Sequence, residues 1–349
     1  MRRQQPLVSV VVPVHNGAHF LERCLDACAA SSYANLEVIV IDDASTDASA
    51  AIAERHGAEV VRLPHQSGPG AARNAGAERA KGEILFFVDA DVVVCVDALE
   101  RAVDRLEREP DVAAVFGSYD DSPAERNLLS QYKNLQHHFV HQTAGVEAAT
   151  FWAGCGAIRR SAFEAAGGFD AARYRRPSIE DIELGYRLRA RGYRIRLDKG
   201  LQGKHLKRWT LGSWLRADIL GRAIPWSVLM LDRKEILHDL NLKVSDRVSA
   251  GLIGLSVALL AASLFRVRLL WIVALLLLAV GILNHAFYAF LKRRGGLWFV
   301  AVAVPLHFLY FFYSGLIFVI CWLARPFRSQ VRAAPGRSPG VKHPLGGSR

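Results

Sequence analysis

The stretch ILFFVDADV, residues 84–92, predicts the fold class of this chain. Five apolar residues in a row are typical of a buried strand in a parallel sheet. The carboxylates of Asp89 and Asp91 follow directly, and ligands of open α/β sheets lie outside the carboxyl ends of the strands. Two close carboxylates repel each other unless a cation lies between them. The stretch therefore favours a divalent metal with a phosphorylated ligand, although a solvated turn with two capping aspartates has the same pattern.

The sequence on either side alternates between strand and helix patterns. Strands are expected at Val8–Pro13, Leu36–Ile41 and Glu59–Leu63, and helices at His19–Ala30 and from the glycine-rich turn 67–70 to Arg79. Strands and helices that alternate at this spacing form β-α-β units with a parallel sheet. The amino-terminal part of the chain is therefore predicted to be an α/β domain.

Charge and apolar residues are unevenly distributed along the 349 residues. Residues 1–205 have the mixed pattern of a soluble domain, whereas residues 248–323 are almost free of charge. The formal net charge is +11, with Lys and Arg crowded in 173–234 and at the C-terminus. Beside apolar runs, this excess indicates a membrane surface as partner, not nucleic acid. The five cysteines form no C-x-x-C pair, so neither a zinc site nor a disulfide framework is indicated.

Five stretches together resemble the family 2 glycosyltransferases, which have a GT-A type nucleotide-diphospho-sugar transferase fold. They are VSVVVPVHNG, EVIVIDDASTD, GPGAARNAG, ILFFVDAD, and GGFD followed by IEDIELG. Each is a weak signal alone, but all five in this order are a strong one. The resemblance covers residues 7–210 and implies an α/β fold with a mostly parallel central sheet, which we assign to a glycosyltransferase domain at 1–208.

A donor site for a nucleotide-diphospho-sugar, expected to be a UDP-sugar, is implied by this resemblance. The backbone of Pro13, Val14 and His15 would lie along the base and ribose. Asp43 would accept a hydrogen bond from the base, although helix capping is the alternative role for this carboxylate. Arg73, after the glycine-rich turn, would meet the nucleotide or its phosphates.

A metal site is implied at the D-x-D triplet. Asp91 would ligate Mg²⁺ or Mn²⁺ at the diphosphate, while Asp89, with Ala90, would hold the nucleotide-sugar or the metal's water shell. Hard cations prefer oxygen ligands, which suits this set. The metal would offset the charge of the departing nucleoside diphosphate.

Glu180 and Asp181 are the candidate catalytic carboxylates, and the resemblance implies that Asp181 is the general base. A carboxylate within hydrogen-bond reach can take the proton of an acceptor hydroxyl during attack. Attack opposite the leaving diphosphate would invert the anomeric carbon. A helix is predicted over Ile182–Arg191, so the two carboxylates could instead cap it, favoured by its dipole.

The segment GKHLKRW, residues 203–209, is similar to the Q-x-x-R-W motif of processive synthases such as cellulose and chitin synthases, with His205 in place of Gln. Arg208 would pair with the diphosphate. Trp209 would offer a flat face to a sugar acceptor, or else anchor the chain at the membrane boundary. His205 would add a metal or phosphate contact. The departure at His205 leaves open whether transfer is processive.

The rest of the chain is predicted to meet a membrane. Residues 209–247 are expected to form amphipathic interfacial helices, broken in two at Pro225. The uncharged runs Val248–Phe265, Leu269–Leu291 and Leu297–Leu323 predict transmembrane helices within 248–324. Three crossings are expected, because all three runs lack charge. The positive-inside rule is divided on this number: with three crossings, the basic residues 292–294 satisfy the rule and the basic tail 325–349 opposes it, and two crossings reverse both placements. The tail itself is expected to be disordered.

Taken together, the sequence predicts a membrane-bound, metal-dependent, inverting glycosyltransferase. We expect a multi-pass protein of the cytoplasmic (inner) membrane whose catalytic domain faces the cytoplasm. The acceptor would be a hydroxyl of a lipid-linked glycan, a glycolipid or a polysaccharide, with polyprenyl phosphate as the alternative. A catalytically silent membrane scaffold is the alternative from another class, and the carboxylates at positions 43, 89, 91 and 181 speak against it.

Overall fold

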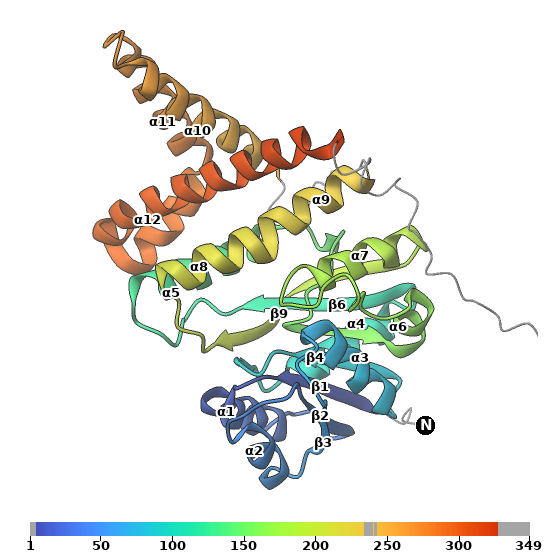
Figure 1. The fold of residues 1–349 in the computed structure, drawn as a ribbon. Coiled ribbons are helices and arrows are strands. Elements are labelled where there is room, and N and C mark those ends of the chain that lie inside the picture. The colour runs from blue at the N-terminus through green and yellow to red at the C-terminus, as the bar shows by residue number, and fades with distance from the viewer. Residues whose placement is uncertain (1–4, 234–239, 241–242, 327–349) are drawn as a thin grey trace, which may run out of the picture.

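The computed structural model describes residues 5–233, 240 and 243–326. A mixed sheet with helices on its faces forms the amino-terminal domain (Figure 1). A layer of helices covers one side of this domain, and a helical hairpin projects from that layer. The predicted tail lies, from residue 327 on, outside the described residues.

The first half of the sheet is parallel, as the sequence predicts. Its strands are β1 (Val8–Val14), β2 (Leu36–Asp42), β3 (Glu59–Arg62) and β4 (Ile84–Val88), and the helices between them are α1 (Ala18–Ala29), α2 (Ser49–Arg55) and α3 (Pro69–Arg79). β1 pairs in parallel with both β2 and β4, and β2 pairs with β3. Every residue of β4 is buried, because helices cover both faces of the sheet at this point.

The second half of the sheet is mixed. Its strands are β5 (Val92–Val94), β6 (Val112–Tyr119), β7 (Glu147–Ala148), β8 (Cys155–Arg159) and β9 (Arg194–His205), and its helices are α4 (Ala98–Arg108), α5 (Leu128–Thr143), α6 (Arg160–Ala166) and α7 (Glu180–Ala190). β8 is antiparallel to β4 and β6, while β6 and β9 are parallel. The expectation of a mostly parallel sheet therefore holds only for the first half. The reason is that the chain enters β8 where β4 ends, with Cys155 opposite Val88.

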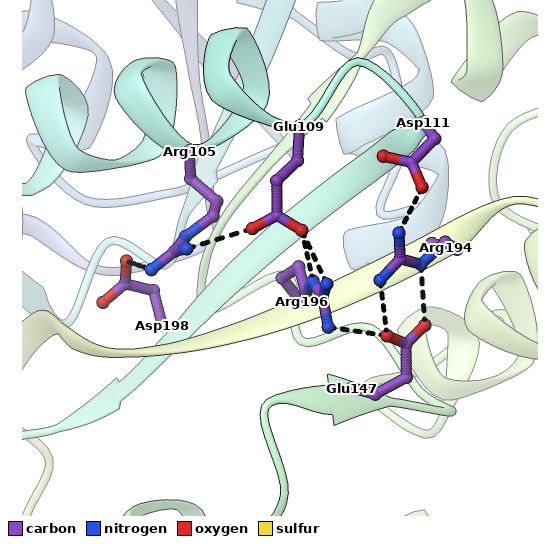
Figure 2. A network of polar contacts seen from close by, with 7 residues as sticks. All are labelled: Arg105, Glu109, Asp111, Glu147, Arg194, Arg196 and Asp198. Atoms are coloured by element: carbon purple, nitrogen blue, oxygen red, sulfur yellow. Dashed lines mark hydrogen bonds and ion pairs between the residues drawn. The ribbon is translucent and has the colours of Figure 1, made fainter.

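Ion pairs hold the long strand β9 against its neighbours (Figure 2). Arg196 contacts Glu109 after α4 and Glu147 of β7, each with N–O distances of 2.6 Å. Arg194 pairs with the same Glu147 at 3.1 Å and with Asp111. Single exposed pairs contribute little, but a shared network fixes geometry. This network lies among α4, β7 and β9 and positions the strand that ends at His205.

A continuous helical rod follows the sheet. It consists of α8 (Leu211–Asp218), a π-helical turn η1 (Ile219–Ala223) and α9 (Ile224–Arg233). The predicted break at Pro225 is wrong, because the chain stays helical through that residue. Proline has no N–H to donate and its ring crowds the preceding turn, and the wider π-helical turn just before it accommodates both effects.

Three apolar helices end the described chain: α10 (Val244–Ala262), α11 (Leu269–Leu283) and α12 (His285–Leu323). α12 bends at Gly296, whose φ of 73° is outside the helical region. By length and composition, α10 and α12 could cross a membrane, and α11 is shorter. The predicted second run therefore divides, because α11 ends at Leu283 and the following residues begin α12.

Candidate active site

The carboxyl end of β4 places the D-x-D turn beside the end of β9. Antiparallel pairing of β5 with β9 sets Val92 opposite His205. As a result, Nε2 of His205 lies 3.5 Å from Oδ2 of Asp91. The backbone N–H of Leu206 also donates to the carbonyl oxygen of Asp91 at 2.8 Å. The structure thus brings together two residues that the sequence separates by most of the domain.

The carboxyl group of Asp91 is set up to be ionised. Burial acts to raise the pKa of Asp91, but His205 and then Lys207 outweigh this effect and hold the pKa below its ordinary value. The ionised carboxylate of Asp91 offers the oxygen ligands that Mg²⁺ and Mn²⁺ prefer. Among the residues that the structure describes, no group of three His, Cys, Asp or Glu side chains is arranged around a cation.

Arg73 joins the D-x-D turn to α7. It is 4% exposed, and its Nη2 donates to Oδ1 of Asp89 at 2.6 Å. Its Nη1 donates to Oε1 of Glu180 at 2.9 Å. Burial, opposed in part by Arg73, raises the pKa of Asp89. Arg73 was predicted to meet the nucleotide, but the structure turns its guanidinium toward these two carboxylates.

Glu180 and Asp181 occupy the first turn of α7, which begins two residues before the predicted helix. Glu180 is 4% exposed, and besides Arg73 it accepts the N–H of Ser178 at 3.0 Å. Asp181 accepts the N–H of Ala153 at 3.1 Å and that of Ile182 at 2.8 Å. Burial, followed by repulsion from Glu180, raises the pKa of Asp181 to about 6. Glu180 is therefore tied to a buried guanidinium, and Asp181 to backbone N–H groups.

The predicted nucleotide-binding residues gather where β1 and β2 end. Val14 is the last residue of β1, and its carbonyl accepts the N–H of Asp43 at 2.8 Å. His15 is exposed, with Nδ1 2.7 Å from the carbonyl oxygen of Asp43. The carboxylate of Asp43 accepts the N–H groups of Ser67 at 2.6 Å and Gly68 at 2.8 Å. Asp43 thus orders the glycine-rich turn before α3.

An aromatic wall, which the sequence reasoning missed, lies beside these carboxylates. We define it as Tyr119, His137, Trp152 and His205. Tyr119 stacks on His205 with ring centroids 4.3 Å apart, and Trp152 meets Tyr119 edge-on at 4.9 Å. His137 lies 4.7 Å from Trp152. The wall therefore reaches from the Asp91 side of the site to the segment that contacts Asp181.

Trp152 holds a central position in this wall and stays partly exposed. A Cβ on Gly154 would lie 2.6 Å from the indole, so the ring rests on that glycine. A tryptophan followed by Ala153 and Gly154 was a signal that sequence reasoning could have used, because small residues leave room for a ring.

Arg208 is exposed, whereas the Trp209 ring lies behind the wall, with its centroid 6.3 Å from that of His205, and is largely buried. The Arg208 side chain is 70% exposed, and its guanidinium lies 3.7 Å from Glu125. Trp209 is 8% exposed and belongs to a helical core cluster with Tyr132 and Trp214. Its flat face is therefore largely covered by protein, which disfavours the predicted stacking of a sugar on this ring.

Residues 9–167 match the protein-family model described as Glycosyl transferase family 2. The chain therefore carries a glycosyltransferase family 2 domain. Two relatives agree with this. Glycosyltransferase GlyG of Streptococcus pneumoniae is 32% identical over 162 residues, which are 45% of this chain and 54% of the relative. The pre-mycofactocin glycosyltransferase of Mycobacterium tuberculosis is 30% identical over 242 residues, 65% of this chain and 48% of the relative. The chain thus spans about half the length of these relatives.

A solved structure supports the same fold over nearly the whole chain. It is the mannosyltransferase PcManGT from Pyrobaculum calidifontis in complex with GDP-Man and Mn²⁺. The TM-score is 0.51 at 20% identity, covering 93% of this chain and 88% of the other. At this identity the likeness concerns the fold, which is a GT-A-like mixed sheet followed by helices.

Proposed function

We propose that this protein is a membrane-bound, inverting glycosyltransferase. It moves a sugar from a nucleotide-diphospho-sugar, expected to be a UDP-sugar, to a hydroxyl of a lipid-linked glycan, a glycolipid or a polysaccharide. One observation carries this proposal. The N–H of Asp89 donates to the carbonyl of Gly154 at 3.2 Å, and the N–H of Ala153 donates to Asp181 at 3.1 Å. Two consecutive residues therefore hold the donor turn and the general-base candidate side by side.

The donor end of the site fits a divalent metal. Asp91 supplies a carboxylate oxygen and His205 an imidazole nitrogen, 3.5 Å from each other. A hard cation needs more oxygens than these two residues provide, and a diphosphate and water supply oxygens of this kind. When bound, Mg²⁺ or Mn²⁺ supplies positive charge that offsets the charge of the departing nucleoside diphosphate. Asp89, paired with Arg73, is held in place beside this pair.

Asp181 is the residue that takes the acceptor proton in this proposal. With a pKa of about 6, its carboxylate is mostly ionised at neutral pH and still basic enough to accept a proton in the transition state. Attack on the face opposite the diphosphate inverts the anomeric carbon. Glu180 is a positioning residue, because its side chain is committed to Arg73 and to the N–H of Ser178.

The acceptor class follows from the need for a base. A phosphate acceptor is ionised near neutral pH and needs no proton removed, whereas a sugar hydroxyl does. Trp152, partly exposed beside Ala153, offers an aromatic face for such a sugar. Transfer to polyprenyl phosphate is the second candidate within the same class.

Exposed apolar side chains support the membrane part of the proposal. At the tip of the α10–α11 hairpin, Leu264, Phe265 and Trp271 are 85%, 89% and 77% exposed. In a bilayer these apolar side chains would contact acyl chains, while the exposed Arg266 and Arg268 between them would extend to polar headgroups. The cytoplasm, where nucleotide-sugars are made, is the side on which the catalytic domain is expected.

The test is transfer by the detergent-purified protein from a panel of nucleotide-sugars, with membrane lipid extract as acceptor and with Mn²⁺ or Mg²⁺. We expect metal-dependent transfer from one donor, with inversion at the anomeric carbon. The Asp91→Asn protein, purified in the same way, is the control for activity from co-purified enzymes. If no donor is transferred or hydrolysed with either metal, the protein is a silent scaffold and the proposal is wrong.

A further inference from the structure

The path of α12 differs from that of a helix that simply crosses a membrane. Its length and composition permit a crossing. After the bend at Gly296, however, α12 runs alongside the rod of α8, η1 and α9 (Figure 1). The contacts along α12 show over what length it packs against the rod and the catalytic domain.

The part of α12 before Gly296 rests on the catalytic domain. Phe287 and Phe290 contact Phe139 of α5, with ring centroids 5.1 Å and 5.5 Å away. Arg294 forms an ion pair with Asp121 in the loop after β6. This part of α12 therefore lies on the catalytic side of any membrane.

The part of α12 after Gly296 also packs against the catalytic domain and the rod. Phe299 belongs to the same helical core cluster as Tyr132 of α5. Further on, the hydroxyl of Tyr313 donates to Asp218 of α8 at 2.7 Å. Phe318 then packs against a cluster that contains Ile179, just before α7.

The rod beneath α12 is itself fastened to the catalytic domain. Lys133 of α5 pairs with Asp218 at 2.8 Å, and the hydroxyl of Ser178 donates to the carbonyl of Gly221 in η1 at 2.9 Å. At the far end of the rod, Arg233 pairs with Glu183 of α7 at 3.0 Å. The rod therefore lies along the domain surface and does not lead away from it.

The packing at both ends of the segment after Gly296 excludes a perpendicular crossing. An α-helix rises about 1.5 Å per residue, so Phe299 and Phe318 are on the order of 30 Å apart, close to the thickness of the hydrocarbon core. In a perpendicular crossing, these two residues would lie at opposite membrane surfaces. Both pack in clusters that contain catalytic-domain residues.

Unlike α12, the α10–α11 hairpin is tied to the rest of the molecule at its base. At its base, Lys243 donates to Thr143 of α5 at 3.0 Å, and Asn284 donates to Ser249 of α10 at 2.9 Å. Both ends of the hairpin are thus tied to the catalytic side. Its tip projects from the rest of the molecule in Figure 1 and carries highly exposed apolar side chains such as Phe265 and Val267.

We propose that the α10–α11 hairpin alone enters the bilayer, and that α12 lies in the plane of the membrane surface between the rod and the lipid. The outward face of α12, with Trp298 77%, Leu316 45% and Ile320 54% exposed, contacts the lipid interface. Arg325 then lies on the catalytic side. The inference rests on the membrane association in the proposed function and replaces the expected three crossings with an even number. Arg325 is then placed as the positive-inside rule favours.

Cysteine labelling of the full-length protein in native membranes tests this topology. Cys95 is exposed on the catalytic domain and reports its side, while the other four cysteines are buried. Arg325→Cys and Val267→Cys are each made in a Cys95→Ser background. A membrane-impermeant maleimide is added to intact spheroplasts and to inside-out vesicles, with labelling after detergent as the control for reactivity.

We expect Arg325→Cys to react in the same preparation as Cys95, and Val267→Cys not to react there. Reaction of Arg325→Cys only in the other preparation overturns the inference, as does reaction of Val267→Cys together with Cys95. Release of the unmodified protein from membranes by high salt would instead show that its attachment to the membrane is electrostatic. It overturns the membrane part of the proposed function as well, whereas the labelling results leave that part standing.

Discussion

Arg73 of α3 and Glu180 of α7 form a buried ion pair, with Nη1 2.9 Å from Oε1 and each side chain 5% exposed. The same guanidinium holds Asp89 of the D-x-D turn at 2.6 Å. One cation therefore fixes the turn that follows β4 relative to the helix that carries Asp181. The catalytic carboxylates depend on this pair for their relative position, because Asp181 is the next residue after Glu180 in the first turn of α7.

Removing the cation should destabilise the domain. In Arg73→Met, Glu180 remains buried without its partner, and breaking a buried pair in this way costs about 3–5 kcal/mol. We expect the lower end of this range, because Asp89 is 33% exposed and water can reach it. Arg62→Met is the matched control, since Arg62 pairs with Glu54 at the surface and such pairs contribute less than about 1 kcal/mol. Denaturant unfolding of both variants in detergent measures the difference, and equal losses would refute the structural role of Arg73.

Asp91→Asn should lower turnover by at least about a hundredfold, because loss of the carboxylate charge weakens metal binding at the diphosphate. The fold should remain, since Asp91 lies in a partly exposed turn. Turnover is measured across a Mn²⁺ titration, with circular dichroism as the check on folding. Asp104→Asn, in an exposed pair with Arg108, is the control for charge loss. Near-normal activity of Asp91→Asn at limiting Mn²⁺ would remove the metal role assigned to this residue.

Asp181→Asn should bind the nucleotide-sugar with Mn²⁺ as the wild type does, but its transfer rate should fall by about 10²- to 10⁴-fold. The proton is removed in the transition state, so loss of the base affects turnover and spares donor binding. Calorimetric donor binding and single-turnover transfer separate the two effects. Loss of donor binding would assign Asp181 to the donor site. Retained transfer to polyprenyl phosphate would favour that acceptor over a hydroxyl.

The pH dependence of wild-type turnover should report the same residue. The pKa of Asp181 is raised to about 6, so the carboxylate becomes protonated as the pH falls through that value. A protonated base cannot accept the acceptor proton, and kcat should therefore decline below about pH 6 and level off above it. A profile that stays flat well below pH 6, with stable protein and saturating metal, would contradict the general-base assignment.

The two tryptophans should respond differently to truncation. Trp152→Ala should raise KM for the acceptor by about tenfold, and Trp152→Phe should restore part of the affinity through the remaining ring. Trp209→Ala should destabilise the protein by about 3–5 kcal/mol, because that side chain is 8% exposed in a helical core. Acceptor kinetics and thermal unfolding of both variants measure this. If instead Trp209→Ala changes acceptor KM in a stable protein, the stacking face lies on Trp209.

The sequence by itself determined the parallel half of the sheet and the position of Asp89 and Asp91 at the end of β4. Strand and helix patterns here come from residues close together in the chain, such as the five buried residues of β4. Local periodicity is sufficient to predict elements of this kind. The motif order also indicated the family 2 domain that residues 9–167 match.

Tertiary structure alone decided which groups meet and which surfaces are covered. Arg73 reaches Glu180 across 107 positions of sequence, and no local pattern predicts such a pair. Trp209 and Trp152 are both aromatic residues in short loops, and packing by distant helices buries the first while the second stays partly exposed. The apolar run that forms the end of α12 shows the same limit. Hydropathy measures the free energy of transferring a segment out of water, and this transfer is favourable into lipid and into a protein core alike. The long-range contacts of Tyr313 and Phe318 determine where the helix lies.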